Sequence, residues 1–362
     1  MDGMTAGHFI FIPAVLLFGL VIGWILGSRA AADAYAAELK RREARASRAA
    51  SGTDRRTPKG SRPGASQALG LLVLGAIVLT AGACGSDAGA PDDGDSVTSG
   101  DQVDVRRRVF DLAPVVIEAL VAGDEGGQSI VLLADSGRGA GRFLDFLPYL
   151  ASAGLRPVAL NPRGVGASVG SLENLTLHDL AADVAGVIEA LDVGPVHVLG
   201  HGFGNRVARC LAADRPELVE GLILLGAAGQ VAGDPEATQA LDRLFEAGLT
   251  DEEKMAALQT ALFAPGSDVS VWAELPAFPE VRRAQSAAEQ ETPREEWLFG
   301  GAAPILIIQG RHDRLAPPEN GRWLRERLGD RVQLVELADS GHALLPEQTA
   351  EVVDAITDFV LP

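Results

Sequence analysis

The clearest chemical pattern in the chain is the glycine-rich segment 196–205 (VHVLGHGFGN). The spacing of Gly200, Gly202 and Gly204 is that of the nucleophile elbow, G-x-S-x-G, a sharp strand-to-helix turn that presents an attacking side chain. The outer glycines let strand and helix approach closely, and the central residue adopts a strained backbone conformation. The central residue here is Gly202 rather than Ser, Cys or Asp. The pattern therefore predicts the turn without its nucleophile.

Two further residues complete the expected chemistry in chain order. Asp313 follows the apolar run 305–308, and His342 follows the apolar run 332–337. An aspartate at this point would orient the imidazole and stabilise its protonated form, which leaves the other ring nitrogen of His342 as a general base. We expect His201 and His312 to be turn residues.

Other polar residues follow two more strand ends. The loop 134–137 (ADSG) carries Asp135 and Ser136, either of which could act as a displaced nucleophile. The turn 161–168 (NPRGVGAS) ends in Ser168, which we expect to hydrogen-bond within its own turn. Cys210, in the helix after the elbow, is expected to be a small buried apolar residue.

Short apolar runs that alternate with helical segments must position these residues. This alternation predicts a parallel sheet covered by helices on both faces. The expected strands are 103–109 and 115–121, which form a leading hairpin, and 129–133, 157–160, 196–199, 222–225, 305–308 and 332–337. The expected helices are 142–153, 175–191, 205–213, 319–328 and 347–360.

A long break in this alternation lies between the strands 222–225 and 305–308. Residues 230–301 are rich in Ala and Glu and contain helical stretches but no clear strand. We expect this insertion to be a helical cap over the carboxyl ends of the strands, where α/β sheets bind ligands.

Together these motifs resemble the α/β-hydrolase fold family, in its lipase, esterase and prolyl-iminopeptidase-like branch. The resemblance covers residues 103–362 and implies an α/β fold: a mostly parallel eight-stranded sheet, helices on both faces, and a cap inserted after strand 6. It implies the triad acid at Asp313, the triad base at His342, and a degenerate nucleophile position at Gly202. The backbone N–H of Phe203 would be an oxyanion donor.

Two other family signatures are altered together with the nucleophile. Residues 134–137, with Asp135 and Ser136 as oxyanion-loop candidates, occupy the place of the His-Gly oxyanion loop but lack its histidine. Asn161 replaces the Asp of the D-x-R-G-x-G-x-S turn. Without the nucleophile, the route through a covalent acyl-serine is closed, and conventional serine hydrolase activity is not expected.

Two functional hypotheses remain open, since fold alone does not choose between them. In the first, the chain has lost catalysis (a pseudoenzyme) and binds a small apolar ligand in a capped pocket. In the second, Asp313 and His342 act as a non-covalent acid–base pair in a hydrolase or lyase that uses a small ester or amide.

The first hundred residues predict membrane attachment. Residues 9–26 are apolar over 18 positions, about 27 Å of helix, and we interpret 1–28 as a membrane anchor. Residues 29–67 form a basic segment typical of a cytoplasmic loop. Residues 68–84 form a second apolar segment or a lipoprotein-like signal with Cys84 as the lipidation candidate, and 85–102 an acidic, disordered linker. The domain 103–362 would then lie on the extracytoplasmic side of a bacterial membrane.

Charge and composition limit the classes of molecule that the chain is expected to bind. Residues 1–66 hold ten basic and five acidic residues (net +5), whereas residues 67–362 hold 21 basic and 44 acidic residues (net −23). Such an acidic body disfavours nucleic acid, so the expected partners are the lipid bilayer and a small-molecule ligand or substrate. The sequence shows no metal-binding cluster, P-loop or dinucleotide fingerprint, and we therefore expect no cofactor and no metal.

Overall fold

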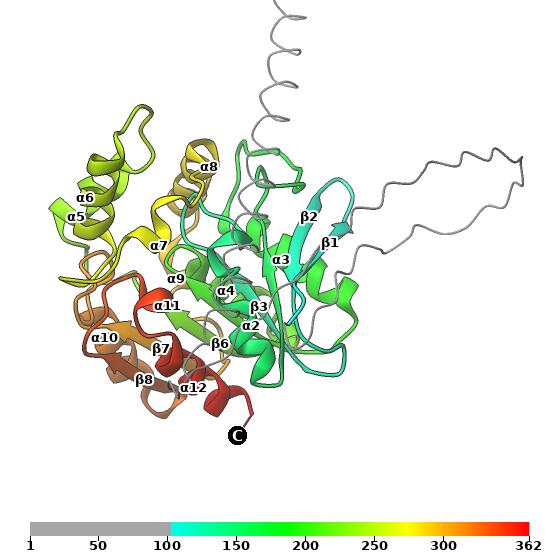
Figure 1. Ribbon diagram of the computed structural model, residues 1–362. Helices are drawn as coiled ribbons and strands as arrows, with labels where there is room; N and C mark the ends of the chain where they lie inside the picture. Colours follow the sequence, from blue (N-terminus) through cyan, green and yellow to red (C-terminus); the bar gives the residue numbers. More distant parts are fainter. Residues whose placement is uncertain (1–102, 362) are drawn as a thin grey trace, which may run out of the picture.

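The apolar runs form the strands of one eight-stranded sheet in the computed structural model, which describes residues 103–361 (Figure 1). The strand order is β1-β2-β4-β3-β5-β6-β7-β8. β2 runs antiparallel to β1 and β4, and every other neighbouring pair is parallel. The strands are β1 Arg106–Asp111, β2 Val116–Val121, β3 Gln128–Leu133, β4 Leu155–Leu160, β5 Val196–His201, β6 Val219–Leu225, β7 Ile305–Gly310 and β8 Val332–Leu337. The predicted mostly parallel sheet and its leading hairpin are confirmed.

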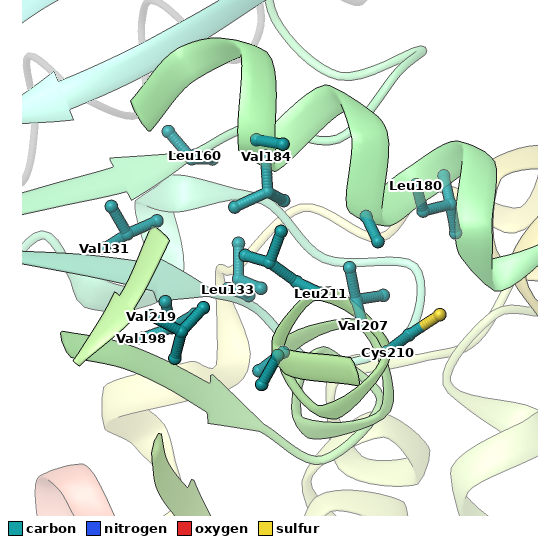
Figure 2. Close-up of a cluster of buried hydrophobic side chains, with 14 of the residues drawn as sticks. Val131, Leu133, Leu160, Leu180, Val184, Val198, Val207, Cys210, Leu211 and Val219 are labelled. Atoms are coloured by element: carbon teal, nitrogen blue, oxygen red, sulfur yellow. The ribbon is translucent and has the colours of Figure 1, made fainter. Parts of the chain in front are cut away.

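Helices cover both faces of this sheet because alternate strand residues point to opposite sides. In β3, Val131 and Leu133 belong to one buried cluster, which includes α3 and α4 (Figure 2), whereas Ile130 and Leu132 belong to a second, which includes α2 and α12. The helices outside the insertion are η1 Ala140–Phe143, α2 Leu147–Ser152, α3 Leu177–Leu191, α4 Gly204–Asp214, η2 Pro216–Leu218, α10 Glu319–Leu328, η3 Gly329–Arg331, α11 Leu344–Glu347 and α12 Thr349–Val360.

The prediction of one helix over 142–153 is wrong. The segment instead forms η1, a short turn and then α2. Pro148 lies in the first turn of α2, where its missing N–H is tolerated. Farther inside a helix its ring would clash with the carbonyl four residues earlier, so the helix begins at Leu147 instead of running through from 142.

The insertion between β6 and β7 is helical among the described residues. It consists of α5 Pro235–Arg243, α6 Asp251–Ala261, α7 Ser270–Ala273, α8 Pro279–Glu291 and α9 Arg294–Trp297. A capping box starts α6, in which Thr250 and Glu253 satisfy each other's backbone N–H groups. We call residues 230–301 the helical insertion.

The predicted membrane segments lie outside the described residues. The apolar runs 9–26 and 68–84 and the linker 85–102 all fall in that part of the chain. Between residues 103 and 361, none of the helices is both long enough and apolar enough to cross a bilayer.

Candidate functional site

The elbow glycines lie where β5 turns sharply into α4. Gly202 has a φ of +52°, in the left-handed region that residues other than glycine rarely adopt. A Cβ atom on Gly200 would collide with the backbone of Asn205, and one on Gly204 would collide with the carbonyl of Leu133. Close approach and backbone conformation therefore account for all three glycines, as the sequence predicted.

Asp313 and His342 lie in contact at the carboxyl ends of β7 and β8. His342 Nδ1 is 2.8 Å from Asp313 Oδ2, and both residues are buried. The other oxygen, Asp313 Oδ1, accepts hydrogen bonds from the backbone N–H groups of Leu315 (2.9 Å) and Ala316 (2.7 Å). The carboxylate is thus held by its own loop, and its second oxygen, Oδ2, contacts the imidazole and accepts from Gln309 Nε2 (3.3 Å).

The Asp135 carboxylate occupies the position that a nucleophile would take. A Cβ atom built on Gly202 would overlap Asp135 Oδ1 and would lie 3.0 Å from His342 Nε2. Asp135 Oδ1 accepts hydrogen bonds from the backbone N–H groups of Ser136 (2.8 Å) and Phe203 (3.4 Å). Asp135 Oδ2 lies 3.6 Å from His342 Nε2. One carboxylate therefore fills the space that a side chain at position 202 would need, and it accepts hydrogen bonds from the N–H groups of Ser136 and Phe203.

Three more side chains enclose this ion cluster. The Arg142 guanidinium lies 3.4 Å from the ring centroid of Trp272 in α7, and its Nη2 lies 3.6 Å from Asp135 Oδ2. The ring of His201 stacks on that of His342 with centroids 4.8 Å apart. His201 Nε2 is 2.8 Å from the carbonyl oxygen of His342 and donates to it, since a carbonyl only accepts.

Burial and neighbouring charges shift the pKa values of His342 and Asp135 in opposite directions. Burial lowers the pKa of His342, but the charge of Asp313 and the contacts with Asp135 outweigh it and raise that pKa to about 10. Burial raises the pKa of Asp135, but the hydrogen bond and charge of His342 hold it well below its usual range. Burial lowers the pKa of His201 to about 3. At neutral pH an imidazolium therefore lies between two carboxylates, next to a neutral histidine.

The loop that carries Asp135 is fastened to the helical insertion. The N–H of Gly137 donates to Gln285 Oε1 of α8 (2.8 Å), and the Gly137 carbonyl accepts from the N–H of Phe278 (3.0 Å). The Arg138 guanidinium donates to the carbonyls of Leu275 (3.2 Å) and Pro276 (3.0 Å). The insertion thus holds Asp135 against His342.

A small cavity lies beside the elbow, between the end of β3, α3 and the start of α4. Its volume is about 50 Å³, which is room for a few waters or a small apolar group. Leu133 and Ala134 of the β3 end, Phe203 and Val207 around the start of α4, and Gln285 of the insertion are among its lining residues. The cavity therefore borders Ala134, the residue before Asp135, and Gln285, whose side chain holds the N–H of Gly137.

The structure brings together Gly202, Phe203, Asp135, Ser136, Asp313 and His342. It leaves His312 exposed, and Cys84 lies outside the described residues. Ser168 Oγ donates to the carbonyl of Asn161 (2.9 Å), as expected for a turn residue.

Sequence reasoning missed Arg142 and Trp272, because neither lies in a motif. The signal that could have found Arg142 is weak, because it is one of two arginines, with Arg138, in the segment after β3. The described residues also contain a candidate metal cluster, His178, Cys210 and Asp214, which lies apart from these site residues.

Comparison with known proteins decides the family. A family model described as alpha/beta hydrolase fold matches residues 133–349. The chain belongs to the α/β-hydrolase fold family.

Several similar proteins are named as hydrolases. Rhodomycin D methylesterase DauP of Streptomyces sp. (strain C5) is 30% identical, covering 61% of this chain and 87% of that protein. The 2-hydroxymuconate semialdehyde hydrolase of Pseudomonas sp. (strain CF600) is 26% identical, covering 65% and 87%. The structure of 2-hydroxy-6-oxo-6-phenylhexa-2,4-dienoate hydrolase from Rhodococcus sp. strain RHA1 superimposes with a TM-score of 0.58 at 23% identity, covering 71% and 98%. That structural likeness supports the fold.

Proposed function

We propose that this α/β-hydrolase-fold protein does not perform serine-hydrolase chemistry, and that it binds a small apolar molecule beneath its helical insertion. One observation carries the proposal: the Asp135 carboxylate lies in the position of the missing nucleophile and accepts hydrogen bonds from the oxyanion N–H pair. A substrate carbonyl has no N–H pair to bind while Asp135 stays there. Gly202 supplies no atom that could form an acyl intermediate.

The acid–base alternative is less well supported. A general base must be neutral at the working pH, and a pKa of about 10 keeps His342 protonated well above neutrality. The same protonation favours an ion-paired resting state, in which the His342 imidazolium lies between the carboxylates of Asp135 and Asp313. These three groups together carry a net charge of −1, and Arg142 lies next to them.

Labelling with a fluorophosphonate, together with ester turnover, tests the catalytic half of the proposal. We expect the wild-type full chain to form no adduct and to hydrolyse short esters no faster than the His342→Ala variant. An adduct on any wild-type side chain of this site, or turnover that His342→Ala abolishes, would contradict the proposal.

A thermal-shift screen with short-chain lipids, lactones and small esters tests the binding half. We expect at least one apolar compound to raise the Tm of the wild-type protein. Val207→Leu adds one methylene to the cavity wall and should reduce that shift, because the cavity is only about 50 Å³. Val169→Leu is the matched control, since Val169 is 62% exposed and lies away from the cavity. Equal shifts in both variants would place the ligand elsewhere.

The position of Asp135 Oδ2, 3.6 Å from His342 Nε2, favours a second candidate, a hydrolase that uses Asp135 as nucleophile toward an alkyl carbon. Asp135 Oδ2 would attack that carbon, and the leaving group would depart with its electron pair and the proton of His342 Nε2. The resulting aspartyl ester is neutral, so His342 loses one carboxylate partner and can deprotonate water. That water adds to Cγ of Asp135, the Cγ–Oδ2 bond breaks, the alcohol leaves, and the acid proton returns to His342.

Single turnover in ¹⁸O-labelled water tests this candidate. The mechanism transfers label from water into the Asp135 carboxylate, which mass spectrometry of the peptide detects. Asp135→Asn is the control and should take up no label. Unlabelled Asp135 after turnover would exclude the mechanism.

We also propose that residues 1–102 tether the domain to the extracytoplasmic face of a bacterial membrane. The support is the two apolar runs with a basic segment between them. Protease added to spheroplasts should then digest the domain without lysis. Metabolic fatty-acid labelling that Cys84→Ser abolishes would support lipidation, whereas unchanged labelling would contradict it.

A further inference from the structure

Three helices bring four potential metal-site residues together away from the elbow, of which Cys210 is buried, His178 is half-buried, and Asp214 and Glu296 are exposed. His178 is in the first turn of α3, Cys210 and Asp214 are one turn apart on α4, and Glu296 is on α9. Figure 2 shows the Cys210 side chain on α4 with its sulfur directed away from the labelled Val198 and Val219. The proposed function uses none of these residues.

We propose that His178, Cys210 and Asp214 bind a divalent zinc ion through His178 Nδ1, Cys210 Sγ and an Asp214 carboxylate oxygen. All three ligand atoms lie within 4.8 Å of one another. Imidazole, thiolate and carboxylate are the ligand types of tetrahedral zinc, and this mixed set suits zinc better than the oxygen-binding magnesium or calcium.

The distances between the ligand atoms agree with this geometry. Zinc bonds of about 2.0–2.3 Å at tetrahedral angles place ligand atoms about 3.3–3.6 Å apart. Cys210 Sγ lies 3.4 Å from His178 Nδ1 and 3.6 Å from Asp214 Oδ2. His178 Nδ1 and Asp214 Oδ2 are closer, at 2.7 Å, and an ion between them would separate them by roughly 0.6 Å. Asp214 is exposed at the end of its helix, so its side chain is free to make this movement.

Glu296 supplies the outer support that such a site requires. Its Oε2 lies 2.8 Å from His178 Nε2. Without metal, His178 Nδ1 donates to the Asp214 carboxylate, which only accepts. Zinc would displace that Nδ1 proton, while Nε2 keeps its own proton on Glu296 and the freed Nδ1 lone pair faces Cys210 and Asp214. This carboxylate–histidine–metal arrangement orients the imidazole and strengthens it as a ligand. Because His178 and Asp214 are partly exposed, solvent can fill the fourth coordination position.

Cobalt titration of the full 362-residue chain, after chelator treatment, tests the site. We expect binding of one Co²⁺ with a tetrahedral d–d spectrum and a thiolate-to-cobalt charge-transfer band, both removed by Zn²⁺. The chain has two cysteines, Cys84 and Cys210, which gives a matched pair of variants. Cys210→Ala should abolish the charge-transfer band, and Cys84→Ala should retain it.

Surface variants keep the test independent of core packing. Asp214→Asn, at an exposed position, should weaken Co²⁺ binding. Glu296→Gln should weaken it about 10- to 100-fold while leaving the spectrum unchanged, as expected for an orienting residue. His312→Asn, an exposed histidine elsewhere, should change nothing. A charge-transfer band that survives Cys210→Ala, no band in the wild type, or equal affinity in Asp214→Asn would overturn the proposal.

Discussion

The carboxylate of Asp135 lies where a side chain on Gly202 would have to stand. A Cβ atom at position 202 would overlap Asp135 Oδ1, and the two residues come from neighbouring strands, β3 and β5. The loss of the nucleophile and the presence of an aspartate in the β3 loop are therefore complementary. A side chain at position 202 therefore requires that Asp135 be moved or replaced.

The first prediction follows from this overlap. Gly202→Ser alone should not gain esterase activity, because the new side chain collides with Asp135, and φ of +52° costs a non-glycine residue about 1–2 kcal/mol. Gly202→Ser with Asp135→Ala removes the collision and leaves the seryl oxygen beside His342. We expect fluorophosphonate to label the double variant and not the single one. Equal labelling of both would show that Asp135 does not obstruct the site.

The second prediction concerns the charge on His342. Asp135→Asn removes one of the two carboxylates that raise its pKa, so that pKa should fall below about 10. NMR titration of the imidazole measures the change. Asp192→Asn is the control, since Asp192 is exposed and already adopts a left-handed conformation that asparagine tolerates. An unchanged pKa in Asp135→Asn would mean that Asp313 alone holds the proton.

The third prediction is the pH dependence of stability. The pKa of His342 is raised from 6.5 to about 10, so its contribution to the free energy of unfolding is complete below pH 6.5 and disappears as the pH rises through about 10. We expect the stability difference between wild type and His342→Gln to shrink between these limits. Urea unfolding at a series of pH values measures it. A constant difference across this window would contradict a folded-state imidazolium.

The fourth prediction concerns the ion pair between Arg163 and Asp183. Arg163 Nε and Nη2 lie 2.6 Å and 2.8 Å from the two Asp183 oxygens, and both side chains are 11% exposed. Asp183→Ala should cost about 3–5 kcal/mol because it leaves a nearly buried guanidinium with little compensation. Arg163→Lys should not preserve the pair fully, since lysine cannot form both bonds in this planar geometry.

The matched control is the exposed pair of Arg215 with Glu189. Arg215→Ala should cost much less than Asp183→Ala, because water screens exposed ion pairs. Chemical denaturation of the three variants checks both expectations. Comparable losses of unfolding free energy in Asp183→Ala and Arg215→Ala would mean that burial of the Arg163–Asp183 pair contributes nothing.

Much of the fold was predictable because its strands are short apolar runs bounded by polar turns. The run 305–308 and the pattern of 175–191 both predict their elements within a few residues. The segment 142–153 failed because apolar spacing alone does not say on which side of Pro148 a helix begins. The absence of a nucleophilic side chain at the elbow was also predictable, because it follows directly from the glycine at position 202.

The direction of the Asp135 side chain was not predictable. The sequence placed it near the strand ends and left open whether it or Ser136 replaced the nucleophile, because a side chain's direction depends on the fold of its loop. Here that loop is held by Gln285, almost 150 positions later in the chain. His178, likewise, lies 32 positions from Cys210, and no local spacing relates them.

The two backbone hydrogen bonds of Gly137 have a mechanical consequence. Its N–H is held by Gln285 and its carbonyl by Phe278, so any swing of α8 away from the sheet draws the neighbouring aspartate along. Retraction of that aspartate would unblock the two amides and weaken the hold on the imidazole proton in one movement. The position of the insertion and the proton affinity of His342 are therefore expected to be linked, and a compound that displaced α8 from the sheet should also lower the pKa of His342.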